Sequence, residues 1–280
     1  MLQRASGQAL THGPNDCGHG RITSVSALRT LRLADNDVTR IGLGTNRLSY
    51  TPEHVAFVQE AVAAGVSHID TAHTYAGGES EETIGAALSP VPAGCVVATK
   101  GGWNGARPEV LRSEIDQSLR RLRTDSIALY YLHRPDPETP LEESLAALKE
   151  AHESGKIRHV GLSNVGIEQI ERGREVVPVA AVQNRYNLSD RSHDDVVDYC
   201  ATEGIPFVAY FPLRGGDGGR PVAEIAERHG ATHAQIALAW LLRRSPTMLT
   251  IPGTLSLDHL EENLAALEIE LSDGELEAQR

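Results

Sequence analysis

The sequence predicts an α/β protein, a (β/α)8 TIM barrel with an N-terminal β-hairpin and extra C-terminal helices. Short apolar runs alternate with helical patterns, and this alternation occurs eight times along the chain. Eight such units close a barrel, because each parallel strand pair needs a crossover helix and closure removes both sheet edges. The length of 280 residues also suits one such barrel.

The first part of the chain is polar and rich in Gly, Ser, His, Asn and Gln. Residues 1–27 are therefore expected to be a flexible tail, and residues 28–280 a single barrel domain. Cys17 and His19 offer only two candidate ligands in this tail, so we expect no metal site there or elsewhere.

A β-hairpin is predicted before the barrel. Two short apolar runs, 28–33 and 38–43, flank the turn-forming residues 34–37. The eight barrel strands are then expected near residues 40–44, 66–69, 95–99, 127–132, 159–162, 179–183, 206–210 and 248–251. The run at 95–99 is continuously apolar, which is typical of a parallel strand buried on both faces.

The helices between these strands are predicted from apolar periodicity and capping residues. They are expected near residues 51–65, 80–88, 111–122, 139–155, 167–174, 194–203, 222–228, 232–243 and 258–265, with a last helix from 272. Thr51-Pro52 is a good helix start, and Gly65 a good stop. Capping boxes are expected at 139–142 and 272–275.

An open doubly wound sheet is the alternative fold. It normally carries a GxGxxG phosphate-binding turn between the first strand and a helix. Residues 41–46 contain two glycines but lack the third, and no helix follows them directly. The barrel therefore accounts for this segment better.

Composition restricts the partners of the protein. The formal net charge of −12 disfavours nucleic acid or an anionic membrane as the main partner. No apolar run approaches the length of about 18 residues that a membrane span needs, and no secretory signal is apparent. The three cysteines lack CxxC spacing and indicate reduced thiols. We therefore expect a cytoplasmic protein.

Four polar residues are expected to meet at the mouth of the barrel. Asp70, Lys100 and His133 each follow one of three adjacent strands, and Tyr75 lies five residues after Asp70. The carboxyl ends of barrel strands face one mouth, and neighbouring strands lie about 4.8 Å apart. Singly, each residue could be a loop cap, a packing residue or half of a structural ion pair. Together they indicate a catalytic group.

The chemistry of these four residues indicates general acid catalysis. A lysine ammonium beside a phenol is expected to lower the pKa of Tyr75, and Asp70 would keep Lys100 charged. His133 could donate a hydrogen bond to a carbonyl oxygen. The set contains no good attacking side chain, so the attacking group must come from a cofactor, and hydride fits.

Several motifs then carry a resemblance to a known family. They are Gly65 to Tyr75 (GVSHIDTAHTY), Ala98-Thr99-Lys100, Tyr131-Leu132-His133, Gly161-Leu162-Ser163-Asn164, Gln183-Asn184 and Ile251-Pro252-Gly253-Thr254. In order and spacing the chain resembles the aldo-keto reductase superfamily over residues 28–270. The resemblance implies a barrel that binds NADP(H) across its mouth, with Tyr75 as proton donor supported by Asp70, Lys100 and His133.

The resemblance also implies cofactor-binding residues. Ser163, Asn164 and Gln183 match positions that hold the nicotinamide carboxamide, and Tyr210 matches the aromatic that stacks on the nicotinamide. The remaining positions serve the pyrophosphate, the terminal phosphate and the adenine: Leu213, Gly253, Thr254, His259, Glu262 and Asn263.

The phosphate end departs from the pattern of many members. Gly253 and His259 stand where those members carry a lysine and an arginine that clamp a 2′-phosphate. NADP(H) is the expected coenzyme, and NAD(H) is not excluded.

The substrate side is less specific. Trp103 is expected to line the pocket, and the short C-terminal segment predicts an open mouth for a small aldehyde or ketone. Two other functions stay open: a Schiff-base lyase using Lys100, and a cofactor-binding regulatory barrel with little turnover. The sequence predicts neither the physiological substrate nor an oligomeric partner.

Overall fold

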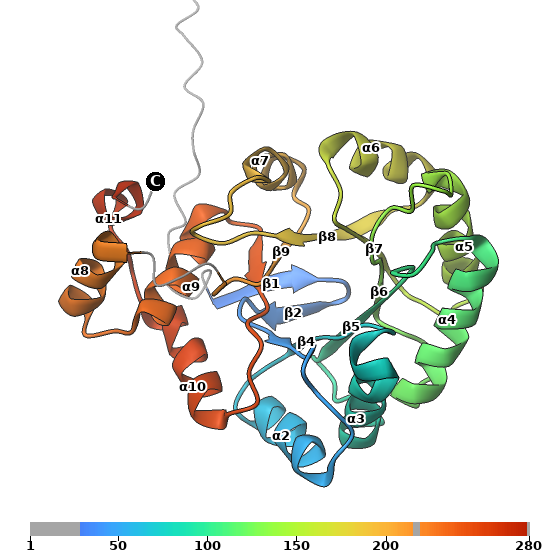
Figure 1. The fold of residues 1–280 in the computed structure, drawn as a ribbon, viewed down its shortest axis with the longest axis horizontal. Coiled ribbons are helices and arrows are strands. Elements are labelled where there is room, and N and C mark those ends of the chain that lie inside the picture. Colours follow the sequence, from blue (N-terminus) through green and yellow to red (C-terminus); the bar gives the residue numbers. More distant parts are fainter. Residues whose placement is uncertain (1–28, 215–218, 279–280) are drawn as a thin grey trace, which may run out of the picture.

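The computed structural model describes residues 29–214 and 219–278. In Figure 1, a ring of strands is surrounded by helices, and a two-stranded hairpin lies at its centre. The hairpin consists of β1 (Thr30–Leu33) and β2 (Asn36–Thr39). The strands of the ring are β3 (Leu43–Gly44), β4 (His68–Asp70), β5 (Val96–Gly101), β6 (Leu129–Leu132), β7 (Val160–Ser163), β8 (Val179–Arg185), β9 (Phe207–Tyr210) and β10 (Met248–Thr250).

The helices follow the strands around the ring. They are α2 (Pro52–Ala63), α3 (Glu79–Leu88), α4 (Pro108–Leu122), α5 (Leu141–Glu153), α6 (Ile167–Val176), α7 (Asp194–Glu203), α8 (Gly219–His229), α9 (His233–Arg244), α10 (Leu257–Ala265) and α11 (Asp273–Glu277). Among the described residues, η1 (Tyr75–Gly78) and η2 (Ala266–Glu268) are 3-10 turns.

The sheet closes into a barrel. Its strands run in the order β10-β9-β8-β7-β6-β5-β4-β3, and every neighbouring pair is parallel. Parallel bridges from Ile41 to Thr250 and from Gly44 to Gly253 join the two edges. The predicted (β/α)8 barrel is confirmed, and the open doubly wound alternative is wrong.

The hairpin packs against the inside of the barrel. Leu33 and Val38 are fully buried and belong to one apolar cluster with the inward-facing residues Val96, Leu129 and Val208. A second, larger apolar cluster includes residues of the strands and of the surrounding helices. The barrel interior is therefore filled by side chains, and the mouth is the place where chemistry can be mounted.

Some local predictions need correction. The expected capping box at 139–142 is absent: α5 begins after Pro140, and the Thr139 hydroxyl donates to Asp136 Oδ2 at 2.9 Å. The hairpin turn is shorter than expected, because β2 already begins at Asn36. The capping box at Ser272 is confirmed.

Two further predictions concern the N-terminal tail and membrane-spanning helices. The expected tail at 1–27 lies outside the described residues. In the part of the chain that the structure describes, no helix is long and apolar enough to cross a membrane.

Candidate active site

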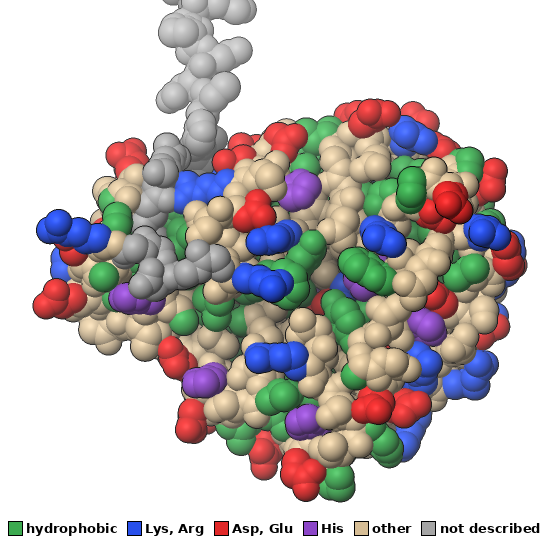
Figure 2. Space-filling model, viewed as in Figure 1, with side chains coloured by type: hydrophobic (Ala, Val, Ile, Leu, Met, Phe, Trp, Pro, Cys, Tyr) green, Lys and Arg blue, Asp and Glu red, His purple; other side chains and the backbone are tan. Residues whose placement is uncertain are grey.

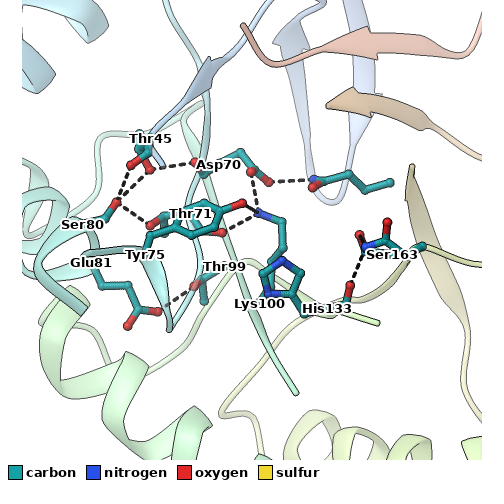
Figure 3. Close-up of polar contacts among 12 residues, drawn as sticks. Thr45, Asp70, Thr71, Tyr75, Ser80, Glu81, Thr99, Lys100, His133 and Ser163 are labelled. Carbon is teal, nitrogen blue, oxygen red and sulfur yellow. Dashed lines mark hydrogen bonds and ion pairs between the residues drawn. The ribbon is translucent and has the colours of Figure 1, made fainter. Parts of the chain in front are cut away.

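The ends of β4, β5 and β6 bring three polar residues to one side of the barrel. Asp70 pairs with Ala98 in the register of β4 and β5, and Lys100 pairs with Tyr131 in the register of β5 and β6. His133 directly follows β6, and its backbone N–H donates to the Gly101 carbonyl at 2.7 Å. The predicted meeting of Asp70, Lys100 and His133 is therefore observed at the mouth (Figure 3).

Lys100 and Asp70 form a buried ion pair. Lys100 Nζ donates to Asp70 Oδ1 at 2.5 Å and to the Thr71 carbonyl at 2.7 Å, and both charged side chains are almost fully buried. Burial lowers the pKa of Lys100, but the negative charge of Asp70 and the hydrogen bonds to Asp70 and Tyr75 outweigh it, so its pKa lies above the ordinary value. Lys100 is therefore an ammonium at neutral pH.

Tyr75 reaches this ion pair from η1. Its hydroxyl lies 3.5 Å from Lys100 Nζ, and Nζ lies 5.0 Å from the ring centroid. Burial raises the pKa of Tyr75, Lys100 lowers it, Asp70 raises it, and the net pKa is above the ordinary value. Lys100 therefore lowers the pKa of Tyr75 as expected, but burial outweighs this effect and the net shift is upward. Tyr75 keeps its proton at neutral pH and is available as a donor.

His133 is the fourth member. Its ring lies edge-on to Tyr75, with ring centroids 6.0 Å apart. Burial lowers the pKa of His133 to about 3, and the charges of Lys100 and Arg134 lower it further. His133 Nδ1 has no hydrogen-bond partner among the described residues. A neutral imidazole therefore lines the site.

Trp103 forms one wall of the mouth. Its ring lies 4.7 Å from that of His133 and is 40% exposed. The loop that carries it is held at both ends: the Gly102 N–H donates to Glu114 at 2.6 Å, and the Ala106 N–H donates to Asp136 at 2.9 Å. The predicted substrate-side tryptophan therefore lies on a loop that is fixed in place.

The residues predicted to hold a carboxamide lie together. Asn164 donates to the His133 carbonyl at 2.9 Å and accepts from the Tyr210 hydroxyl at 2.6 Å. Ser163 Oγ lies 3.1 Å from the Asn164 amide nitrogen. Gln183 is different, because its amide donates to Asp70 Oδ2 at 2.7 Å. The amide of Gln183 thus joins the predicted carboxamide set to the buried ion pair.

Most of these side chains line one cavity of about 390 Å³. Figure 2 shows a hollow near the middle of the face in view, with basic and hydrophobic side chains around it. The lining residues are Gly44, Thr45, Asn46, Asp70, Thr74, Tyr75, Trp103, His133, Ser163, Asn164, Gln183, Tyr210, Phe211, Ile251 and Gly253.

The other predicted cofactor residues do not line this cavity. Thr254 bonds locally with Ser256, and Glu262 accepts the Thr232 hydroxyl at 2.6 Å. His259 and Leu213 are exposed, whereas Asn263 is buried. Of the predicted phosphate-end residues, only Gly253 reaches the cavity.

Sequence reasoning missed several lining residues. Thr45 and Asn46 directly follow β3, so the strand-end rule that identified Asp70 could have found them. Arg47 was also missed, and its guanidinium donates to the Gly253 carbonyl at 2.8 Å. A cation therefore lies at the segment where the expected lysine and arginine are replaced.

Three buried hydroxyl groups form hydrogen bonds beside the backbone of Asp70. Ser80 Oγ lies 2.7 Å from Thr71 Oγ1 and 2.9 Å from Thr45 Oγ1 (Figure 3). Thr45 Oγ1 donates to the Asp70 carbonyl at 2.8 Å. These bonds fix the backbone that carries Asp70 and receives Lys100.

The arrangement of these residues can deliver a proton. Within residues 29–214 and 219–278, no three His, Cys, Asp or Glu side chains gather as metal ligands. A protonated phenol beside a buried ammonium can donate to an oxygen that gains negative charge. The cavity beside it is lined by amide, hydroxyl and aromatic side chains, which suits a planar polar ligand.

Comparisons with known proteins agree with this geometry. A model of the Aldo/keto reductase family matches residues 40–219 and 217–279. Pyridoxine 4-dehydrogenase of Escherichia coli is 36% identical over 271 residues, which are 87% of this chain and 94% of that protein. An uncharacterized oxidoreductase of Schizosaccharomyces pombe is 37% identical over 265 residues, which are 87% of this chain and 86% of that protein.

A solved structure is similar throughout the barrel. The aldo/keto reductase of Klebsiella pneumoniae in complex with NADP and acetate has a TM-score of 0.81 and 32% identity. The alignment covers 90% of this chain and 94% of that chain.

Proposed function

The chain belongs to the aldo/keto reductase family, and from this premise we propose that it reduces aldehydes or ketones to alcohols with NADP(H). The proposal rests on one observation above all, the protonated Tyr75 hydroxyl held 3.5 Å from the buried Lys100 ammonium. The similar Klebsiella pneumoniae enzyme was solved in complex with NADP, which supports the choice of coenzyme.

The residues at the mouth fit a nicotinamide coenzyme. Ser163, Asn164 and Gln183 offer hydroxyl and amide groups, which suit a carboxamide with one acceptor oxygen and two N–H donors. Tyr210 supplies an aromatic ring beside them, and its hydroxyl is held by Asn164 at 2.6 Å. When bound, the nicotinamide supplies the hydride that adds to the carbonyl carbon.

The chain's own residues then handle the proton. Tyr75 gives its hydroxyl proton to the carbonyl oxygen, which gains the negative charge as the carbon is reduced. The phenolate left on Tyr75 is stabilised by the Lys100 ammonium, and Asp70 keeps that ammonium charged and aimed. Neutral His133 donates one N–H to the same substrate oxygen and orients the carbonyl.

The two other functions receive less support. A Schiff-base lyase needs a neutral amine, but the pKa of Lys100 is raised and Nζ is bonded to Asp70 and Thr71. A regulatory barrel with little turnover needs no proton donor, yet Tyr75 keeps its hydroxyl at the ammonium.

A single substitution tests the proposal. Tyr75→Phe removes only the hydroxyl, so we expect NADPH oxidation with a panel of aldehydes and ketones to fall by about 10²–10⁴-fold, with NADPH affinity unchanged. The matched control is Tyr50→Phe, because the Tyr50 side chain is 49% exposed and lies outside the cavity. Wild-type turnover in Tyr75→Phe contradicts the assignment, and borohydride trapping of substrate on Lys100 supports the lyase.

Coenzyme preference is tested by titration with NADPH and NADH. Trp103 lies at the cavity, 4.7 Å from His133, so its fluorescence should report binding. We expect tighter binding of NADPH. Equal affinities assign dual use, and binding of neither coenzyme contradicts the reductase proposal.

A further inference from the structure

The turn that carries Tyr75 has an unusual backbone. Ala76, Gly77 and Gly78 have φ angles of 48°, 67° and 107°, so three successive residues adopt left-handed conformations. Glycine tolerates this region, but the Cβ of Ala76 makes it unfavourable there. Such a turn needs contacts from elsewhere in the protein to stay in one conformation.

Arg121 makes those contacts from α4. Its Nη1 donates to the His73 carbonyl at 3.1 Å, before the turn, and lies 3.3 Å from Glu81 Oε2, after the turn. Between these contacts the guanidinium packs against Gly78, where an added Cβ would overlap it. One planar cation therefore contacts the chain on both sides of Tyr75, at His73 before it and at Gly78 and Glu81 after it.

Glu81 extends this hold to the strand that carries Lys100. The Glu81 side chain is completely buried, and its other oxygen accepts the Thr99 hydroxyl at 2.6 Å (Figure 3). Thr99 is the neighbour of Lys100 on β5. A fully buried carboxylate is costly without a cation, so Arg121 also holds Glu81 in place.

We infer that Arg121 is a positioning residue for the proton donor. By linking the turn to β5 through Glu81 and Thr99, Arg121 keeps the Tyr75 hydroxyl within reach of Lys100 Nζ, at 3.5 Å. This inference rests on the proposed function. Arg121 does not line the cavity, so it acts through Tyr75 and not on the substrate.

The first experiment compares turnover with coenzyme binding. In Arg121→Met we expect kcat to fall on the order of tenfold to a hundredfold, because small misplacement of a reacting group costs that much. NADPH affinity should stay within about twofold, since no carboxamide contact changes. Arg121→Lys keeps the charge but cannot contact both sides of the turn, so its kcat should be intermediate.

Arg120→Met is the matched control. Arg120 is the neighbouring residue on α4, is exposed, and makes no ion pair with another described residue. Its kcat should equal that of the wild type. An Arg121→Met protein with wild-type kcat overturns the inference, and so does a loss of kcat and NADPH affinity by the same factor.

Hydrogen exchange gives a measurement that needs no turnover. We expect faster exchange of residues 73–79 in Arg121→Met than in the wild type or Arg120→Met. Unchanged exchange in this segment overturns the inference. A wild-type protein that reduces no carbonyl compound contradicts the proposed function instead, and the exchange data still decide whether Arg121 holds the turn.

Discussion

The three residues at the ends of β4 to β6 and two residues that follow β10, Thr254 and His259, are held in different ways. Asp70 bonds to Lys100 and Gln183, which lie 30 and 113 residues away from it in the sequence. Thr254 and His259, in contrast, bond to Ser256 over two and three residues. The proposed chemistry is thus held by contacts across the whole barrel, whereas Thr254 and His259 bond locally, and the exposed His259 can change at little cost to the fold.

The largest effect is expected at the buried ion pair of Lys100 and Asp70. Lys100→Met leaves Asp70 buried without a cation, so the free energy of unfolding should fall by about 3–5 kcal/mol. Turnover should fall by at least about 10²-fold, because Tyr75 loses its ammonium. Urea unfolding and NADPH oxidation measure the two effects.

A double variant separates stability from chemistry in that experiment. Asp70→Asn with Lys100→Met removes both charges, so stability should return in large part while turnover stays lost. If Lys100→Met alone is as stable as the wild type, the ion pair is not the buried anchor that its geometry indicates.

An intermediate effect on stability is expected for the buried His68, with the exposed His259 as the comparison. Burial lowers the pKa of His68 to about 4, with Asp70 raising it and Lys100 lowering it, and both ring nitrogens lack partners among the described residues. The folded pKa is below the unfolded value of about 6.5. The unfolded chain therefore binds a proton first, and stability is lost as the pH falls from about 6.5 to about 4.

The measurement is urea unfolding at several pH values in this window. His68 should contribute a loss of about 1.4 kcal/mol per pH unit, which His68→Phe removes. His259→Gln, on the exposed segment, should leave the slope unchanged. A His68→Phe protein with the wild-type slope assigns the acid sensitivity to other groups, of which His133 is the next candidate.

The smallest effect is expected on coenzyme affinity, from a change at the exposed His259. His259→Arg restores an exposed cation after β10, so NADPH should bind about two- to fivefold more tightly, as surface ion pairs of 0.3–1 kcal/mol give. NADH affinity should stay the same, and fluorescence titration measures both. Equal tightening of both coenzymes, or none, would locate the 2′-phosphate away from residue 259.

The strand-end residues could be predicted because their position follows from local patterns. Apolar runs and helical spacing locate the strands, and the barrel rule then brings Asp70, Lys100 and His133 to one mouth. The direction of the pKa shift of Tyr75 could not be predicted in this way. It depends on how deeply the phenol is buried, and burial is a property of the packed barrel.

Contacts between distant residues were also beyond local patterns. The Gln183 amide lines the cavity and also donates to Asp70, a contact that no local pattern indicates. Thr139 was expected to cap α5, yet its hydroxyl bonds to Asp136 in the preceding turn. Arg121 gave no signal at all, because the turn that it contacts lies about one barrel unit earlier in the chain.

The sequence by itself determined the number of β/α units, the closed barrel and the residue types at each strand end. Those features follow from hydrophobic periodicity, which neighbouring residues carry. Only the tertiary structure decided which partner each polar group takes, how the turn after Asp70 is held, and which way burial moves the pKa values of Tyr75 and His133. Those outcomes depend on distances and solvent exclusion, and both arise only when segments far apart in the chain pack together.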